Sequence, residues 1–286
     1  MAQPVPHTPG IAGFDHAVVA VRNLDAARDT YARMGFKLAP RGVHSTGSMN
    51  YNIMLEKDYI ELLTVPQNNS LQTYFYEYLQ RDEGLAGLAI TGTDLNAAWK
   101  VLHSKGFDPT RPQDFSRPVT QGSRTGTAKF ALTNISSYTT PGAQLFICQH
   151  FTRDLVWLPE LQKHANGATG LAGVALVADN VTYVAGVYSK LFGKRPEPID
   201  EGMKIETGSA PLAVCSRASL QSRLKGVELP QRLSTGPRVG ALFIRVRDRQ
   251  VAFKVLREGG FSPKKLADGS CAVDASLAHG IALVFG

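Results

Sequence analysis

Two stretches decide the fold of this chain: Phe14-Asp15-His16-Ala17-Val18-Val19-Ala20-Val21 and Tyr59-Ile60-Glu61-Leu62-Leu63. Each is a short apolar run of the kind that forms a buried β-strand. Between them, residues 24–36 have the spacing of an amphipathic helix that ends at Gly35. Asp25 lies in the first turn of that helix, where the helix dipole favours an anion. The sequence therefore predicts a strand, a helix and then three further strands.

His16 and Glu61 stand in these strands at positions where folding alone would favour another aliphatic residue. A carboxylate inside an apolar strand is costly to bury unless it is paired, hydrogen-bonded or bound to a cation. A neutral imidazole and a carboxylate are also two of the ligand types that hold divalent metals in proteins. The pair is therefore the first candidate for a functional site.

The strand and helix unit recurs three more times, beginning at residues 85–90, 173–177 and 241–246. Each copy continues into a helical pattern, and these helices end at Gly106, Gly193 and Gly260. Self-similarity at the level of a supersecondary unit outweighs any local assignment. The prediction is an α+β protein of four βαβββ modules that associate as two pairs.

The module order, the opening Asp15-His16, the helix ending in Gly35-Phe36 and the strand at residues 58–63 resemble the vicinal oxygen chelate superfamily. That superfamily includes glyoxalase I, extradiol ring-cleaving dioxygenases and fosfomycin-resistance proteins. The likeness is closer to its glyoxalase-like domain branch, whose glycine and asparagine segment is similar to His44-x-x-Gly47-x-x-Asn50. The resemblance covers nearly the whole chain as a module pattern, and its specific motifs lie mainly between His16 and Leu63.

The resemblance implies two domains, each with a curved mixed sheet built from two modules. The expected organisation is a flexible leader at 1–11, a first domain at 12–151 with modules 12–66 and 85–151, a linker at 152–169, and a second domain at 170–286 with modules 170–216 and 239–286. Pro159 and Asn166-Gly167 act as breakers in the linker. The length suits two domains that each bury a core of their own.

In the family, metal ligands come from the first and last strands of each module. His16 and Glu61 match these places in the first module, whereas the second module has Gly87 and Phe146 there. The corresponding residues of the second pair are about Gly173, Ala213, Ala241 and Ala282. The first pair therefore has half of a ligand set and the second pair has none. His150 is the best candidate for a third ligand.

The resemblance implies the following roles in the first domain. His16, Glu61 and His150 would hold a divalent metal (Zn, Fe, Mn or Ni), and Glu61 and His150 would take part in catalysis. The residues expected to contact the substrate are His44, Asn50, Asn52, Gln149 and Trp157. Trp157 could either cover the mouth of the first barrel or hold the two domains together.

Two functions remain open at this level. One is a metal-dependent lyase, isomerase or ring-cleaving dioxygenase that acts on a small molecule with vicinal oxygens. The other is a metal-free protein that sequesters a small molecule, as resistance proteins of the superfamily do. The incomplete ligand set favours the second function, and the Glu61 carboxylate favours the first.

Composition and charge limit the kinds of partner and the cellular compartment that we expect for the protein. Hydrophobic residues make up 43% of the 286 residues and charged residues 19%, and no run is long enough for a membrane span. Three widely spaced cysteines without a CxxC pair indicate a reduced, cytoplasmic protein, expected as a monomer or homodimer. The net charge is +7, and residues 217–265 carry twelve Lys/Arg against three Asp/Glu. Because nucleic-acid-binding motifs are absent, no nucleic-acid partner is expected.

Overall fold

The computed structural model describes residues 7–68, 72–121, 124–234 and 236–286. It contains two eight-stranded mixed sheets, which confirms the predicted α+β class and the four βαβββ modules. The elements of the first sheet are β1 (Ile11–Ala20), α1 (Leu24–Arg33), β2 (Gly42–Val43), β3 (Met49–Met54), β4 (Tyr59–Thr64), α2 (Thr73–Arg81), β5 (Gly84–Gly92), α3 (Leu95–Ser104), β6 (Gln113–Gln121), β7 (Arg124–Asn134) and β8 (Gln144–His150).

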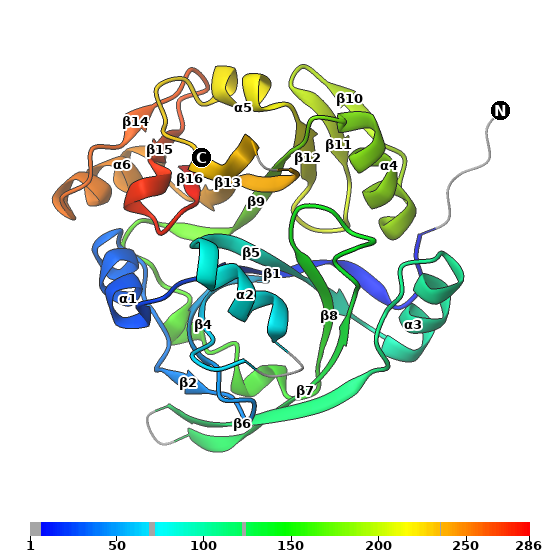
Figure 1. Cartoon of the computed structure of the whole chain (residues 1–286). Helices are drawn as coiled ribbons and strands as arrows, with labels where there is room; N and C mark the ends of the chain where they lie inside the picture. The colour runs from blue at the N-terminus through cyan, green and yellow to red at the C-terminus, as the bar shows by residue number, and fades with distance from the viewer. Residues whose placement is uncertain (1–6, 69–71, 122–123, 235) are drawn as a thin grey trace.

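The second half, which runs from green to red in Figure 1, repeats this order. Short 3-10 turns at Arg153–Leu155 and Pro159–Leu161 connect the halves. The second half comprises β9 (Ala168–Val177), α4 (Val181–Phe192), β10 (Glu197–Ile199), β11 (Gly202–Ile205), β12 (Leu212–Cys215), α5 (Arg217–Arg223), β13 (Arg238–Val246), α6 (Arg249–Glu258), β14 (Lys264–Lys265), β15 (Cys271–Val273) and β16 (Ala282–Phe285), with further 3-10 turns at Gln231–Ser234 and Ala275–Leu277.

The two sheets have the same topology. Their strand orders are β2-β3-β4-β1-β5-β8-β7-β6 and β10-β11-β12-β9-β13-β16-β15-β14. In each sheet the first strands of the two modules pair antiparallel at the centre, and each also pairs parallel with the last strand of its own module. The first sheet is so curved that its edges meet, since a Cβ added to Gly42 in β2 would lie 3.5 Å from the Arg117 guanidinium in β6.

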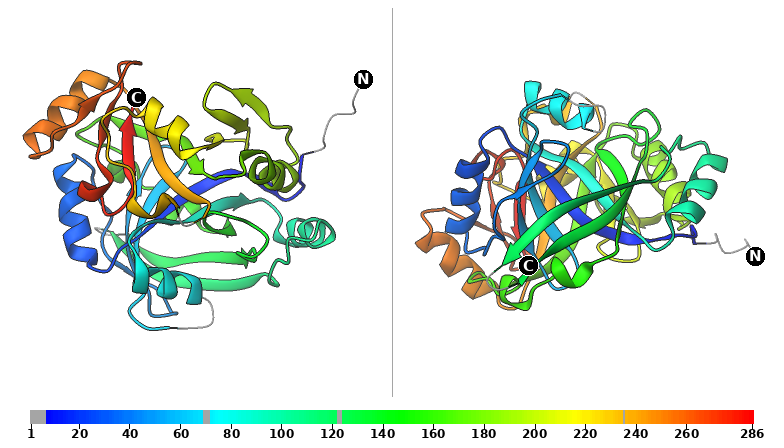
Figure 2. Two further views of the ribbon diagram at one scale, coloured as in Figure 1. Left: turned by 45° about the horizontal axis from the view of Figure 1, so that its top comes forward. Right: turned by 90° about the horizontal axis from the view of Figure 1, so that it is seen from below.

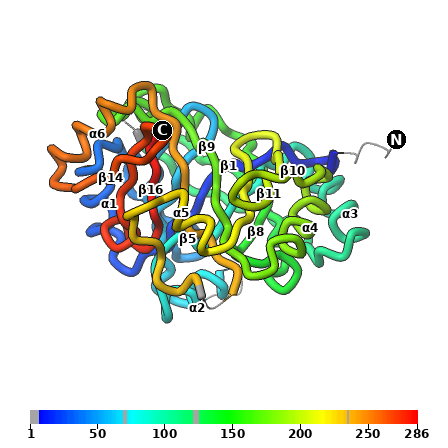
Figure 3. Tube along the Cα trace, turned by 90° about the horizontal axis from the view of Figure 1, so that it is seen from above, coloured from blue at the N-terminus to red at the C-terminus, as the bar shows by residue number. Residues whose placement is uncertain are grey.

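The four module helices share one start signal. Each begins after an Asn or Asp whose side chain accepts a hydrogen bond from a backbone N–H of the first turn, and these residues are Asn23, Asp94, Asn180 and Asp248. Figures 2 and 3 show that α1 lies beside α6 at one end of the molecule and α3 beside α4 at the other. Helices α2 and α5, which join the modules of each pair, were not part of the sequence prediction.

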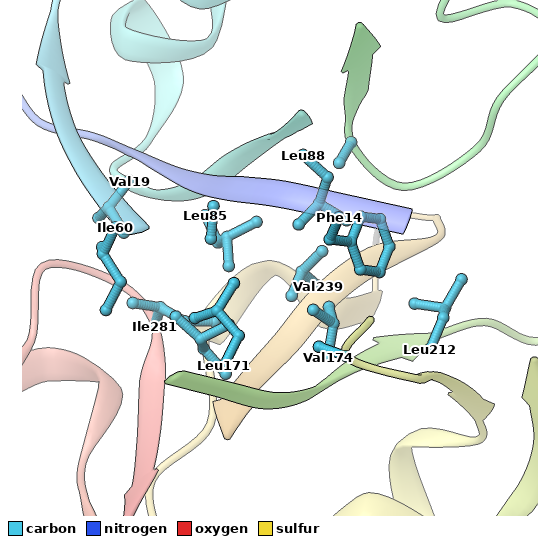
Figure 4. Packing of buried hydrophobic residues seen from close by; sticks show 14 of the residues in the cluster. Phe14, Val19, Ile60, Leu85, Leu88, Leu171, Val174, Leu212, Val239 and Ile281 are labelled. Carbon is cyan, nitrogen blue, oxygen red and sulfur yellow. The ribbon is translucent and has the colours of Figure 1, made fainter. Parts of the chain in front are cut away.

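One hydrophobic core lies between the two sheets. Figure 4 shows Phe14, Leu85 and Leu88 of the first sheet packed towards Leu171 and Val174 of the second. The concave face of each sheet has a smaller apolar cluster of its own. The expectation that each half buries its own core is therefore incomplete, because the largest core belongs to both.

Polar contacts join the halves as well. Asp58 accepts a hydrogen bond from the backbone N–H of Leu171 at 3.0 Å, and Arg247 forms an ion pair with Glu56 at 2.9 Å. At the start of the chain, Thr8 is buried and its hydroxyl donates to the carbonyl of Leu191. Residues 7–11 of the expected leader are thus part of the folded molecule, while 1–6 lie outside the described residues. No helix in the described ranges is long and apolar enough to cross a membrane.

Candidate functional site

The two faces of β1 contribute to different apolar clusters. Ala17, Val19 and Val21 belong to the core between the sheets, whereas Val18 and Ala20 belong to the cluster on the concave face. This alternation follows from the two-residue period of a strand. Residues on the Val18 face therefore point into the hollow of the first sheet.

A β-bulge adds a second functional side chain to β1. Phe14 pairs with Ile90 and His16 pairs with Ala89, so Asp15 is one extra residue on the β1 side. A bulge breaks the alternation locally and re-aims side chains. Asp15 and His16 are consequently both buried beside the hollow, although they are neighbours in sequence.

A cavity of about 110 Å³ occupies the concave face of the first sheet. Five of the predicted site residues lie in its wall: His16, His44, Asn50, Asn52 and Glu61. Apolar side chains make up much of the remainder, including Phe75, Phe115, Phe130 and Phe146. A mostly apolar hollow with a few convergent polar groups is the usual form of a small-molecule site.

His16 and Glu61 meet across the pair of parallel strands β1 and β4. His16 Nε2 lies 3.6 Å from Glu61 Oε2, and the two residues are 2% and 8% exposed. The other Glu61 oxygen, Oε1, accepts a hydrogen bond from Asn50 Nδ2 at 2.5 Å. The His16 ring stacks on Tyr59, with ring centroids 4.1 Å apart. Both functional heads are therefore held in place by neighbours on the same sheet.

Asp15 orients two histidines. Its Oδ2 atom lies 2.7 Å from His16 Nδ1 and 3.1 Å from His150 Nε2. Burial alone would raise the pKa of Asp15, but the hydrogen bonds from His150 and His16 outweigh it and hold that pKa well below its ordinary value. An ionised Asp15 can accept the Nδ1–H of His16, and His16 Nε2 is the ring atom that lies near Glu61 Oε2 at 3.6 Å and near the Tyr59 hydroxyl at 3.4 Å. The sequence prediction included no role for Asp15, because strict alternation places it on the opposite face from His16.

His150 lies behind the cavity wall. Its Nε2 atom is 3.5 Å from Cys148 Sγ, and its buried Nδ1 atom has no hydrogen-bond partner among the described residues. Asp15, Cys148 and His150 each offer a ligand atom, and these atoms lie within 4.8 Å of one another, which is close enough to hold a metal ion. Burial raises the pKa of the Cys148 thiol well above its usual value, which opposes formation of the thiolate.

His44 and Asn52 complete the polar wall. His44 Nδ1 is 2.7 Å from Ser48 Oγ, and its Nε2 is 3.5 Å from Asn50 Nδ2. Burial lowers the pKa of His44. Asn52 pairs with Glu61 across β3 and β4, and its buried Oδ1 atom has no hydrogen-bond partner among the described residues. A buried acceptor without a donor is uncommon in folded proteins and marks a place where a bound group can donate.

Two predicted substrate-binding residues lie elsewhere. Gln149 Oε1 accepts from the backbone N–H of Leu95 at the start of α3, so Gln149 does not line the cavity. Trp157 packs edge-to-face on His150 and Tyr59, at centroid distances of 5.0 and 5.4 Å. Trp157 therefore packs on the first sheet behind the cavity wall, which is neither of the two places expected from the sequence.

The strand registers explain the missing ligands. In the first module Val18 of β1 lies opposite Glu61 of β4, and in the second module Ala89 of β5 lies opposite Phe146 of β8. Phe146 is therefore the counterpart of Glu61. Gly87, two residues before Ala89, is the counterpart of His16, which lies two residues before Val18. A Cβ on Gly87 would approach the Phe75 ring to 2.7 Å, so an aromatic side chain from α2 fills the second histidine's place.

The second sheet obeys the same register. Ala175 lies opposite Ala213, and Phe243 lies opposite Val284. Val284 rather than Ala282 is therefore the counterpart of Glu61 in the last module, two residues later than the sequence alignment placed it. Side chains of these types offer no metal-binding atom.

Comparisons with solved structures agree on the fold. A hypothetical protein from Staphylococcus aureus superposes with a TM-score of 0.68 at 15% identity, over 96% of this chain and 98% of that chain. A mutant of 4-hydroxymandelate synthase from Streptomyces coelicolor gives a TM-score of 0.61 at 12% identity, over 96% and 92%. The Mn(II)-bound glyoxalase from Novosphingobium aromaticivorans gives 0.55 at 10% identity, over 96% and 82%.

Sequence comparison adds the family. No curated protein sequence matches the chain. The profile of the glyoxalase-like domain matches residues 14–192, which include the whole cavity and the first strand and helix of the second half. The chain therefore belongs to the glyoxalase-like domain family of the vicinal oxygen chelate superfamily.

Proposed function

We propose that the cavity of the first sheet binds a small molecule with two adjacent oxygen atoms at a divalent cation held by His16 and Glu61. The observation that carries this proposal is the 3.6 Å separation of His16 Nε2 and Glu61 Oε2 in the cavity wall. Two ligands at ~2.0–2.2 Å from one ion with a tetrahedral angle lie roughly 3.4 Å apart. The pair therefore suits two cis positions on one ion, and the remaining positions are left for water or substrate.

The supporting contacts have the form that metal sites need. A metal-bound histidine usually donates its other ring N–H to a carboxylate, which fixes the tautomer and strengthens the ligand, and Asp15 has this relation to His16. Asn50 likewise fixes the Glu61 carboxylate. When bound, a divalent cation would polarise the substrate oxygens and stabilise negative charge that develops on them.

The chain's own residues supply the rest of the chemistry. Asn52 Oδ1 has no hydrogen-bond partner among the described residues and can accept one from a substrate hydroxyl, and aromatic side chains line the cavity beside it. When Glu61 is not bound to a cation, its carboxylate, which lines the cavity, could instead take a proton from a substrate carbon or hydroxyl. Lyase or isomerase chemistry and ring cleavage by dioxygen both fit this set of groups, and Zn, Fe, Mn and Ni all fit its ligands.

His150 has a positioning role in this proposal and is not a ligand. Its Nε2 atom is engaged with Asp15, and its side chain does not line the cavity. An ion at the alternative site of Asp15, Cys148 and His150 would compete with the two histidine hydrogen bonds at Asp15 Oδ2. It would also require ionisation of a thiol whose pKa is raised by burial.

A metal-free binding protein is the second candidate, and one observation favours it. Phe75 and Phe146 occupy the places where a second histidine and a second carboxylate would complete the ligand set. A cavity so lined can hold a small molecule by apolar burial and hydrogen bonds alone.

Metal analysis decides between the candidates. We expect one divalent ion per chain in protein purified without chelator, and we expect His16→Ala and Glu61→Gln to weaken metal binding by at least about 100-fold, since each removes one of few ligands. Cys148→Ser and the exposed-site control His103→Ala should bind as the wild type does. Wild-type protein that binds no divalent ion in calorimetry, but still binds small molecules, would decide for the binding protein. Loss of the ion in Cys148→Ser with retention in His16→Ala would move the site to the deeper cluster.

A further inference from the structure

Arg117 is a cation in the cavity wall that no described residue neutralises. It lies on β6, where Phe115, Arg117 and Val119 share the inward face. Its side chain is half-buried and lines the cavity, yet it has no ion pair and no hydrogen bond to any residue in the described ranges. A guanidinium withdrawn from water without a partner is costly, and its planar fork of N–H donors suits a carboxylate.

The cavity's own carboxylates do not reach Arg117. Glu61 is held by Asn50 and His16, and it forms no ion pair with Arg117 within 4.0 Å. Asp114 also lines the cavity, but it is exposed and forms no ion pair with Arg117. Arg117 lies beside the edge strand β2, because a Cβ added to Gly42 would lie 3.5 Å from Arg117 Nη1. The guanidinium and the His16–Glu61 pair are therefore two separate polar points in one hollow.

Aromatic side chains fill the space around these two points. The Phe115 and Phe130 rings stack with centroids 4.9 Å apart and planes inclined by 26°. Phe146 lies edge-to-face against His16 at 5.4 Å, and Phe75 covers Gly87 from α2. Flat apolar walls favour a flat apolar body, because rings gain both from burial and from offset or edge contacts.

We propose that the ligand of this cavity is a small organic anion with an aromatic body, whose carboxylate pairs with Arg117 while its other oxygens face His16 and Glu61. This proposal deepens the proposed function, because it names the substrate class of the same site. It assigns Arg117 as the specificity-determining residue. The carboxylate pairing needs no metal, so the two proposals can be tested separately.

The test uses four compounds that vary the carboxylate and the adjacent oxygens independently: benzoate, benzamide, 3,4-dihydroxybenzoate and 3,4-dihydroxybenzamide. Binding to the full-length protein is measured by ligand-observed NMR and calorimetry, first after chelation and then with added Mn²⁺ or Zn²⁺. The variants are Arg117→Gln and, as a matched control, Arg257→Gln on the exposed face of α6.

We expect each carboxylate to bind metal-free wild-type protein at least about tenfold more tightly than its amide, as a charge-assisted hydrogen bond predicts. Arg117→Gln should abolish this preference without weakening amide binding, and Arg257→Gln should leave both unchanged. Added metal should strengthen only the dihydroxy compounds. Equal binding of acids and amides, persistence of the preference in Arg117→Gln, or no binding of any carboxylate would overturn the assignment of Arg117. Absence of the metal effect alone would overturn only the proposed metal function.

Discussion

Asp15 links the two histidines of the site, and its effect on them can be measured. Asp15→Asn removes the carboxylate that accepts from His16 Nδ1 and His150 Nε2. If His16 binds a metal, we expect metal affinity to fall by about 10–100-fold, the usual cost of losing such a supporting carboxylate. Calorimetric titration with Zn²⁺ or Mn²⁺ checks this, with Asp154→Asn on the exposed 3-10 turn as control. Unchanged affinity would mean that the tautomer of His16 does not depend on Asp15.

Asp58 predicts how stability depends on pH. The pKa of Asp58 is raised to about 7, mainly because the carboxyl group is buried, and the charge of Asp15 raises it further. The hydrogen bond from the Leu171 N–H and the charges of Arg245 and Arg153 lower this pKa, but burial has the larger effect. The folded state therefore binds the Asp58 proton more tightly than the unfolded state does, whose pKa is near 3.8. This contribution to stability is complete below about pH 4 and is lost as the pH rises towards 7.

Asp58→Asn isolates this contribution, because asparagine keeps an oxygen for the Leu171 N–H but does not titrate. We expect the melting temperature of the variant, relative to wild type, to increase between pH 5 and pH 8. Differential scanning calorimetry across that range provides the measurement. Parallel pH profiles for the two proteins would show that Asp58 has an ordinary pKa.

At the scale of elements, the contact between α1 and α6 depends on a glycine. Gly259 follows α6 and has an ordinary φ of −73°, but an added Cβ would lie 1.9 Å from the carbonyl oxygen of Arg33 at the end of α1. We expect Gly259→Ala to destabilise the protein by about 1–3 kcal/mol, since backbone must move to admit the methyl group.

Gly186 within α4 provides the matched control. Outside its own stretch of helix backbone, no atom lies within 4 Å of a Cβ added there, so Gly186→Ala should stabilise the protein by about 0.5–1 kcal/mol through helix propensity. Urea unfolding of both variants measures the difference in the free energy of unfolding. If Gly259→Ala raised the free energy of unfolding as Gly186→Ala does, the contact between α1 and α6 would be loose enough to accept a side chain.

For the whole molecule, the shared core predicts cooperative unfolding. Phe14, Leu88, Leu171 and Val174 are buried by contacts between the two sheets. A fragment of residues 1–166 would expose the first sheet's half of this core. We expect the full chain to unfold in one transition and the fragment to aggregate or lack a cooperative melt, because burial of this surface is the main favourable term. A fragment that melts cooperatively as a monomer would show that the first half is an independent domain.

Periodicity in the sequence was sufficient to predict the four modules. Apolar strand runs, helical spacing and glycines at the helix ends are local signals, and each module repeats them. The sequence also singled out His16 and Glu61 as polar residues in apolar strands, the family resemblance implied their ligand roles, and the structure brings their heads to 3.6 Å. Helices α2 and α5 were not predicted, although Phe75 of α2 fills part of the site.

The sequence by itself determined the α+β class, the module order and the two residues that form the candidate metal pair. Only the tertiary structure decided what surrounds that pair. The bulge at Asp15 depends on its pairing with β5, and the placement of Arg117 beside the cavity depends on the curvature that brings β6 back to β2. Gln149 accepts a hydrogen bond at the start of α3 instead of lining the cavity, and Val284 rather than Ala282 is the counterpart of Glu61 in the last module. Both outcomes depend on strand registers that are set by partners distant in sequence. Pairing between strands that are distant in sequence produces no local periodicity, so a sequence pattern cannot predict its register.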